Sequence, residues 1–363
     1  MICNHLPRLA LAALLAPLVL GACGKDTDGD DTGPDTDGTT GTPGGDSSGD
    51  DTGTGPAEDG MEIVANNIDD GALLSAWSNG DELIFAGGEI SGAGRGYYVR
   101  KNGDTWCTED VSDRAIWWLH GASEGEWYAV GEQGLILHYT GGEHVDESVP
   151  TDVTLYGVFD EGDRTWAVGG DASVGSGEAW VREGGVWTKV EGITDGPLFK
   201  VWCDDQSSCV INGAFTSHIV EGATDTIREP DVQPEAHLLT CRGSSFTDVW
   251  CAGGTSGSEV WRWDGSAWSE ASTSGLGQPL MGVAVASDGK VWVSGMSGTF
   301  AWWDGESWGT DIPYSIEPFH AVVEHQGEMY FAGGNLTTTS GDYYGTIGHY
   351  GQAAGAPEIT TCQ

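Results

Sequence analysis

The chain has 363 residues, of which 59 are glycine and 17 are tryptophan, and it carries a formal net charge of −42. So acidic a protein repels phosphate backbones and anionic membrane faces, which excludes nucleic acid as a partner. The same charge favours solubility and cationic partners.

The N-terminal segment has the composition of a secretory signal. Arg8 precedes an apolar run from Leu9 to Leu20, which is too short to span a bilayer core of ~30 Å as a helix. Residues 20–23 then place small side chains directly before Cys23. This arrangement resembles the lipobox of bacterial lipoproteins, in which the cysteine becomes the first residue and carries acyl chains such as palmitate. The resemblance implies a signal peptide at 1–22 and lipidation at Cys23; the alternative is an ordinary signal beside an incidental cysteine.

The segment that follows contains no large apolar residue. Residues 24–60 are Gly, Asp, Thr, Ser and Pro with few exceptions, so they cannot bury enough surface to offset their ordering entropy. We therefore predict that 23–60 is the lipidated cysteine followed by a disordered acidic linker. Asp26–Asp31 is similar to a calcium loop but lacks the glycine at position six and the glutamate at position twelve. We expect no cofactor and no metal site; a structural calcium ion has no support.

Downstream of residue 60 one sequence pattern recurs about seven times: a strand, a glycine turn, a second strand, an Asp-Gly turn and a tryptophan. Successive anchor glycines are about forty residues apart, and several short strands per unit at that period favour a β-propeller over a helical solenoid. The anchors end the second strand of each unit and are Gly87, Gly131, Gly169, Gly213, Gly253, Gly295 and Gly333.

We predict an all-β fold with seven blades of four antiparallel strands. Each unit opens on an apolar pair such as Leu73-Leu74, and its tryptophans are expected to pack between blades, because a single sheet cannot cover its own faces. The expected propeller spans 61–363, with blades at about 70–111, 112–151, 152–193, 194–232, 233–275, 276–314 and 315–350.

Two families share parts of the repeat. The Gly-Gly pair after strand two, the aromatic residue in strand three and the tryptophan that opens strand four resemble Kelch repeats, as at Gly253-Gly254, Trp263 and Trp268. The Asp-Gly-x-x-Trp turn at 264–268 is similar to a degenerate Asp-box of the sialidase type. Both resemblances imply a propeller, and neither brings an assignable set of catalytic residues.

Six cysteines remain after Cys3 and Cys23 are set aside. An even number of cysteines in an exported protein indicates disulfides. The sequence contains no Cys-x-x-Cys motif, so a metal site built from these cysteines is not favoured. Two pairs flank short turns within one blade, which leaves a third pair between blade 1 and the tail. The expected bonds are Cys203–Cys209, Cys241–Cys251 and Cys107–Cys362.

A propeller must pair its last blade to avoid exposed edges. Blade 7 lacks a clear fourth strand. We expect residues 61–65 to supply it, with 357–361 as the rival segment.

One rim of a propeller carries the loops between strands two and three, and scaffolds commonly place specificity on such loops. These loops are long in blades 1, 3 and 7, and they supply Arg95, Tyr343 and Tyr344 as candidate contacts. Among the first strands, Trp118 and Lys200 interrupt a column of small residues expected around the channel. Lys200 could hold an anionic group; the alternative is neutralisation by a neighbouring carboxylate.

The sequence favours a monomeric binding module for an envelope protein or a glycan. It would be held outside the cytoplasm through acyl chains on Cys23, in an outer membrane or at a cell surface in preference to an inner membrane. One alternative is a glycosidase or lyase at the channel mouth, which would require converging carboxylates and an Arg or His. Another is a structural envelope component.

Overall fold

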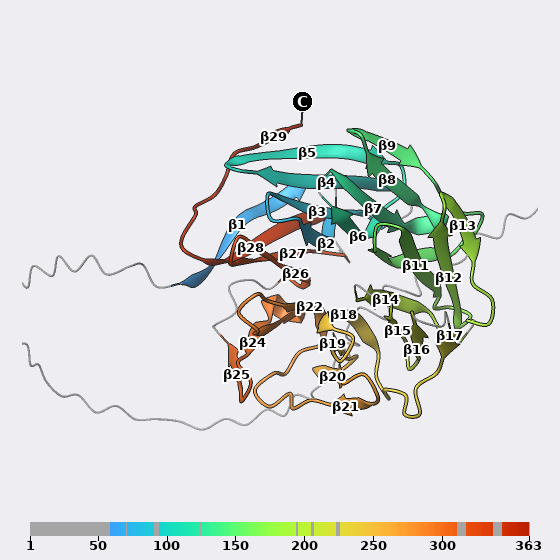
Figure 1. Ribbon diagram of the computed structural model, residues 1–363. Helices are drawn as coiled ribbons and strands as arrows, with labels where there is room; N and C mark the ends of the chain where they lie inside the picture. Colours follow the sequence, from blue (N-terminus) through green and yellow to red (C-terminus); the bar gives the residue numbers. More distant parts are fainter. Residues whose placement is uncertain are drawn as a thin grey trace, which may run out of the picture.

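The computed structural model describes residues 59–69, 71–90, 94–123, 125–193, 195–204, 207–222, 226–310, 317–336 and 343–362. Seven sheets are arranged in a ring (Figure 1). The described residues form strands and two single 3-10 turns, Glu132–Gly134 and Met296–Gly298, and contain no α-helix. The predicted seven-bladed propeller is therefore confirmed. The signal segment, Cys23 and the linker lie outside the described residues.

Each blade is built on four antiparallel strands, and in blades 1 to 6 these four follow chain order from the channel outward. The strands of blades 1 to 3 are β2 Ala72–Ser78, β3 Glu82–Glu89, β4 Arg95–Asn102, β5 Thr105–Ser112; β6 Ile116–Ser123, β7 Glu126–Gly131, β8 Ile136–Thr140, β9 Glu143–Asp146; and β10 Thr154–Asp160, β11 Arg164–Asp171, β12 Ser176–Glu183, β13 Val186–Lys189. Those of blades 4 to 6 are β14 Leu198–Cys203, β15 Cys209–Gly213, β16 Ser217–Glu221, β17 Thr226–Arg228; β18 Leu238–Ser245, β19 Asp248–Gly253, β20 Glu259–Trp263, β21 Trp268–Glu270; and β22 Leu280–Val285, β23 Val291–Gly295, β24 Phe300–Trp303, β25 Trp308–Thr310.

Blade 7 takes its outer strand from the other end of the chain. It comprises β26 Phe319–His325, β27 Glu328–Gly334, β28 Tyr344–Gly351 and β1 Gly60–Asp69, which pairs antiparallel with β28. Glu62 of β1 lies 3.0 Å from one ring nitrogen of the fully buried His349, and Glu328 of β27 lies 3.0 Å from the other. The N-terminal segment thus occupies the place we expected for 61–65, and it is held by side chains as well as by the ladder.

The rival C-terminal segment lies elsewhere. β29 (Ile359–Thr361) runs parallel to β5 as a fifth strand of blade 1. There the Cys107–Cys362 disulfide joins the tail to that blade. The other two bonds are Cys203–Cys209 and Cys241–Cys251, each between residues directly opposite in a hairpin. All three are the expected pairs.

The same steric restriction requires glycine at all seven anchor positions. A Cβ at any of the seven would overlap the backbone carbonyl oxygen of the residue just before the apolar pair of its own blade. In blade 5 that oxygen belongs to His237 and accepts the Gly254 N–H at 3.0 Å. Glycine is therefore required because the two backbones approach too closely for any side chain.

The tryptophans fill the space between blades. Eleven of the seventeen are buried and the rest are half-buried. Trp263 is fully buried and lies against Trp268 with ring centroids 5.6 Å apart. Between them Gly265 has φ +93°, and the Asp264 carboxylate accepts the N–H groups of Ser266 and Ala267 at 2.8 Å. These bonds hold the pKa of Asp264 down, to about 2. The repeated Asp-Gly turn is thus a self-capped hairpin that places its tryptophan between blades.

Candidate functional site

One residue from the innermost strand of every blade lines a pocket at the channel mouth. It directly follows the leading apolar residue of the strand; in blades 1 to 6 it is the second residue of the apolar pair, and in blade 7 it is His320. The seven are Leu74, Trp117, Tyr156, Phe199, Leu239, Met281 and His320, and we call them the mouth ring. Trp117, Tyr156 and Phe199 form an aromatic arc across three blades, with centroids 5.1 Å and 5.7 Å apart.

A β-bulge turns each ring residue toward the channel. In blade 5 the register passes from Leu238 opposite Gly253 to Thr240 opposite Ala252, which leaves Leu239 without a partner. The same irregularity occurs at the same place in the other six blades. A bulge re-aims one side chain, so the first residue of the pair enters the core and the second faces the channel. The anchor glycine, which lies opposite the first residue of the pair, allows the two neighbouring backbones to approach closely at the bulge.

The space at the pocket amounts to about 670 Å³, a figure that includes space open to solvent. Its basic side chains are Lys200, His237 and His320, and the hydroxyl of Tyr156 and the indole N–H groups of Trp117 and Trp118 add further polar groups. Within the described residues its lining contains no carboxylate. His320 Nε2 lies 3.1 Å from the Gly334 carbonyl oxygen. Because a carbonyl only accepts, Nε2 carries the proton and Nδ1 is the acceptor. Burial lowers the pKa of His320 to about 4, so the imidazole is neutral at physiological pH.

Two of the five predicted ligand-face residues, Trp118 and Lys200, line this pocket. Arg95 instead pairs with Asp110 of its own blade, with Nε 2.9 Å from Oδ1. The Tyr344 hydroxyl donates to Glu317 at 2.5 Å, which raises the tyrosine pKa to about 12. Tyr343 is half-buried and is not among the residues that line the pocket. The structure thus brings together the channel candidates and not the loop candidates.

Sequence reasoning missed an exposed aromatic at the rim. Phe215 lies in the short turn between β15 and β16, is 58% exposed, and contacts the pocket residue His237 with centroids 4.2 Å apart. Its φ is +57°, a left-handed conformation that costs a bulky residue about 1–2 kcal/mol. Blades 2 and 6 place Gln133 and Ser297 at the equivalent position. An exposed phenylalanine kept in a strained conformation suggests a contact role.

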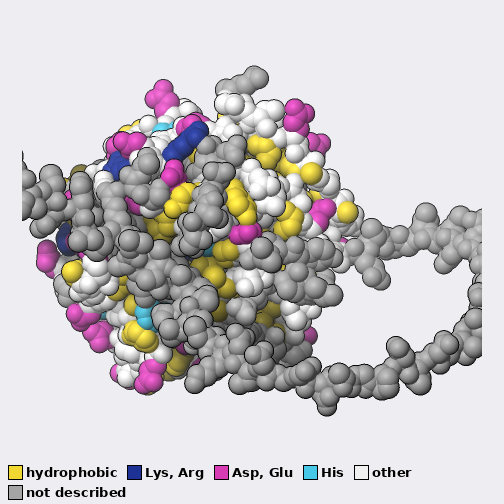
Figure 2. Space-filling model, turned by 180° about the vertical axis from the view of Figure 1, so that it is seen from behind, with side chains coloured by type: hydrophobic (Ala, Val, Ile, Leu, Met, Phe, Trp, Pro, Cys, Tyr) yellow, Lys and Arg dark blue, Asp and Glu magenta, His cyan; other side chains and the backbone are white. Residues whose placement is uncertain are grey.

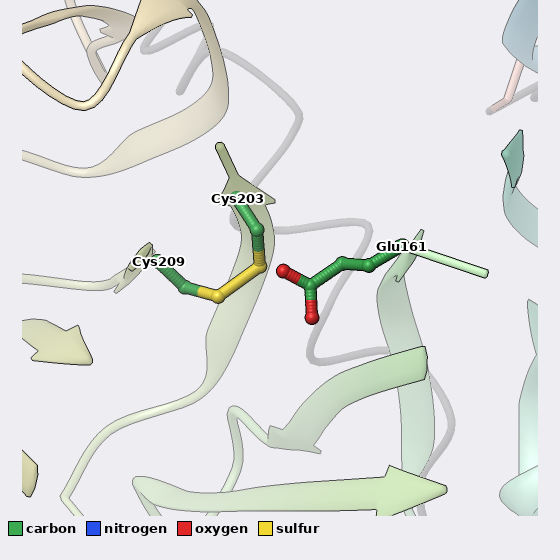
Figure 3. Close-up of side chains that lie close together, drawn as sticks. All are labelled: Glu161, Cys203 and Cys209. Atoms are coloured by element: carbon green, nitrogen blue, oxygen red, sulfur yellow. A yellow bond between two sulfur atoms is a disulfide. The ribbon is translucent and has the colours of Figure 1, made fainter. Parts of the chain in front are cut away.

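Away from the mouth, one group of side chains has the residue types of a metal site. The Glu161 carboxylate points toward Cys203 and Cys209, and the three possible ligand atoms lie within 4.8 Å of one another (Figure 3). The two sulfurs are bonded to each other, so they offer no thiolate. No described residue makes a hydrogen bond of normal geometry with a Glu161 oxygen, although Arg164 and Ser207 lie near enough to favour the charged carboxylate. This cluster is therefore a poorly solvated carboxylate beside a disulfide.

Glu161 makes stability depend on pH. Burial raises the pKa of Glu161 from 4.5 to about 7. The protonated side chain is therefore favoured in the folded protein, and the stability that this protonation contributes is fully present below pH 4.5 and is lost as the pH rises through about 7. We expect the wild-type protein to lose about 1–2 kcal/mol of its free energy of unfolding between pH 5 and pH 8 because Glu161 ionises, a value lowered to allow for partial exposure of the side chain. Glu161→Gln should not show this loss. Urea unfolding at both pH values measures it. The exposed Glu191→Gln should keep the wild-type slope; a wild-type slope in Glu161→Gln would contradict the assignment.

The charged side chains visible in Figure 2 are mainly acidic. Asp and Glu side chains are spread around the margin of the face in Figure 2, with few basic side chains between them. The buried Lys200 and the half-buried Arg242 stand apart from this pattern inside the channel. No helix of the described residues is long and apolar enough to cross a membrane.

The chain is similar to known propellers in structure only. The sequence matches no protein family, and no curated protein is similar to it. The virginiamycin B lyase of Staphylococcus aureus has 12% identity and a TM-score of 0.64, with 82% of this chain and 100% of the lyase covered. YCF48 bound to D1 peptide has 14% identity and a TM-score of 0.59, covering 81% and 97%. The WD40 propeller domain of Doa1 has 10% identity and a TM-score of 0.60, covering 82% and 98%. These likenesses show the fold alone.

Proposed function

We propose that this protein is a lipid-anchored binding module outside the cytoplasm, and that its channel mouth binds an envelope protein. The mouth ring carries the proposal: seven bulges present six apolar side chains and one neutral histidine to a single opening. Such a surface suits an apolar anchor from a partner, because buried aromatic pockets supply most binding energy in protein interfaces. YCF48, a neighbour in fold, was solved with a peptide bound.

A protein ligand fits this mouth better than a glycan. Sugars require several hydrogen-bonding acceptors and donors beside an aromatic platform, whereas the lining contains no carboxylate or amide side chain within the described residues and is mainly apolar or aromatic. Anchoring through Cys23 rests on the lipobox-like segment. An acidic linker behind the lipid would hold the propeller away from the membrane.

A lyase or glycosidase at the same mouth is the alternative, and one neighbour in fold is a lyase. Glycoside chemistry uses a pair of carboxylates, and the described pocket lining supplies none. Saturable binding without turnover supports the binding module. Product formation that depends on the mouth would replace it.

Phe215→Asn tests the proposal directly. Asparagine tolerates the left-handed conformation, so we expect the variant to be about 1 kcal/mol more stable, yet to bind the envelope partner about tenfold more weakly. The partner would be captured from envelope extract by the immobilised full chain, identified, and then titrated as a purified protein.

The matched control is Val186→Asn. Val186 is 64% exposed in the β12–β13 hairpin, which the antiparallel order places at the opposite end of the blade. Binding that is unchanged by Phe215→Asn, or weakened equally by both variants, would contradict a ligand site at the mouth. Absence of any saturable partner would favour a structural envelope component.

A further inference from the structure

Lys200 reaches across the channel floor between three blades. It projects from β14 of blade 4, and its Nζ donates to the Tyr156 carbonyl of blade 3 at 2.7 Å. The same Nζ lies 4.0 Å from the ring centroid of Trp118 in blade 2. Both long side chains fit because the other innermost strands carry small residues at this level, namely Ser75, Gly157, Thr240, Gly282 and Ala321.

No anion accompanies this ammonium group. Lys200 is 7% exposed, and within the described residues no carboxylate forms an ion pair with it. The neighbouring charge is another cation: the Arg242 guanidinium lies 5.0 Å from the same Trp118 ring and donates to the Cys241 carbonyl at 3.1 Å. A chain with 56 acidic and 14 basic residues thus brings two cations together without an acid.

Such a pair is costly without a counter-charge. A buried charge requires a counter-charge or a full set of hydrogen bonds, and an ammonium group has three N–H donors, of which one is bonded here. Burial, and then the charge of Arg242, hold the pKa of Lys200 well below its usual value. Arg242 is not among the pocket-lining residues, so it adds positive field rather than a contact.

We propose that the channel mouth binds a carboxylate carried on an apolar body, with the carboxylate on Lys200 and the apolar part inside the mouth ring. This deepens the proposed function and depends on it. Lys200 is the one cationic side chain of a lining that is otherwise apolar, aromatic or histidine, so it matches a monoanion; a phosphate dianion would leave one of its charges without a counter-charge in the lining. The carboxylate can belong to the C-terminal residue of a protein or to a free carboxylic acid.

Two matched probe pairs separate these sources. The first is acetyl-Ala-Phe with a free carboxylate against the same dipeptide as its C-terminal amide. The second is 3-phenylpropanoate against 3-phenylpropanamide. We expect each acid to bind the full chain at least about tenfold more tightly than its amide, measured by calorimetry. Preference in both pairs indicates that any apolar carboxylate suffices, and preference in the dipeptide pair alone indicates a chain terminus.

Lys200→Met should abolish the preference for acid over amide, whereas Lys200→Arg should retain part of it. Lys290→Met removes a surface lysine that pairs with Asp288 and should leave the preference unchanged. Thermal unfolding checks that each variant is folded. Equal binding of acid and amide, a preference that survives Lys200→Met, or no binding of any probe would overturn the proposal. Loss of protein capture by Phe215→Asn would stand independently of these outcomes.

Discussion

Replacing Gly253 by alanine is expected to destabilise the protein by about 3 kcal/mol, one of the two largest effects we predict. The new Cβ would overlap the His237 carbonyl oxygen, and neither of the two backbone segments can move without loss of the Gly254 N–H bond to that oxygen. The bulge that presents Leu239 to the mouth depends on the same close approach. Urea unfolding followed by tryptophan fluorescence would measure the loss.

Gly257→Ala is the matched control. It lies four residues downstream in the β19–β20 loop, where a Cβ meets no atom within 4 Å and φ is not in the left-handed region. Its stability should change by no more than about 0.5 kcal/mol. A similar loss of stability in both variants would mean that the general effect of replacing glycine by alanine on chain entropy, rather than the steric overlap at Gly253, determines the destabilisation.

The fold was predictable because its requirements fall on single residues. Gly253 and its counterparts recur since no other residue fits beside the carbonyl oxygen, and they set the period from which seven blades follow. Glycine in the Asp-Gly turns supplies a positive φ, as Gly265 does at +93°. Cys203 and Cys209 lie opposite each other in one hairpin, so proximity in sequence was sufficient to pair them.

The mouth ring was not predicted, because strand alternation breaks down where it forms. We expected the channel to be lined by the column that contains Ser75 and Lys200, two residues after each leading apolar residue. The bulges bring the intervening residue into the lining as well. The available signal was the apolar pair itself, as at Leu73-Leu74, since strict alternation would bury one and expose the other.

The loop candidates do not line the pocket, for a different reason. Loop length drew attention to Arg95 and Tyr344, but each is engaged by a carboxylate, Asp110 and Glu317 respectively. Phe215 lies in a short turn and was overlooked, although it is the exposed aromatic in contact with the pocket residue His237. Whether a side chain can contact a ligand depends on whether it is already bound to another residue. The spacing of residues in the sequence does not reveal such intramolecular contacts.

The disulfide between Cys107 and Cys362 should contribute more stability than the other two. It joins residues 255 apart in the sequence, whereas Cys203 and Cys209 are 6 apart. A cross-link restricts the unfolded chain more as the loop that it closes grows. We expect the Cys107→Ser/Cys362→Ser double variant to lose about 4 kcal/mol, and Cys203→Ser/Cys209→Ser about 2 kcal/mol.

Guanidinium unfolding of both double variants under non-reducing conditions tests this order. The β1–β28 ladder closes the ring without help from the tail, so the first variant should remain a folded propeller with native tryptophan fluorescence. Its loss should then reflect the less restricted unfolded chain rather than an opened ring. Equal losses in the two variants would show that local packing around each bond, and not loop length, determines its contribution. Failure of the first variant to fold would instead assign ring closure to the tail.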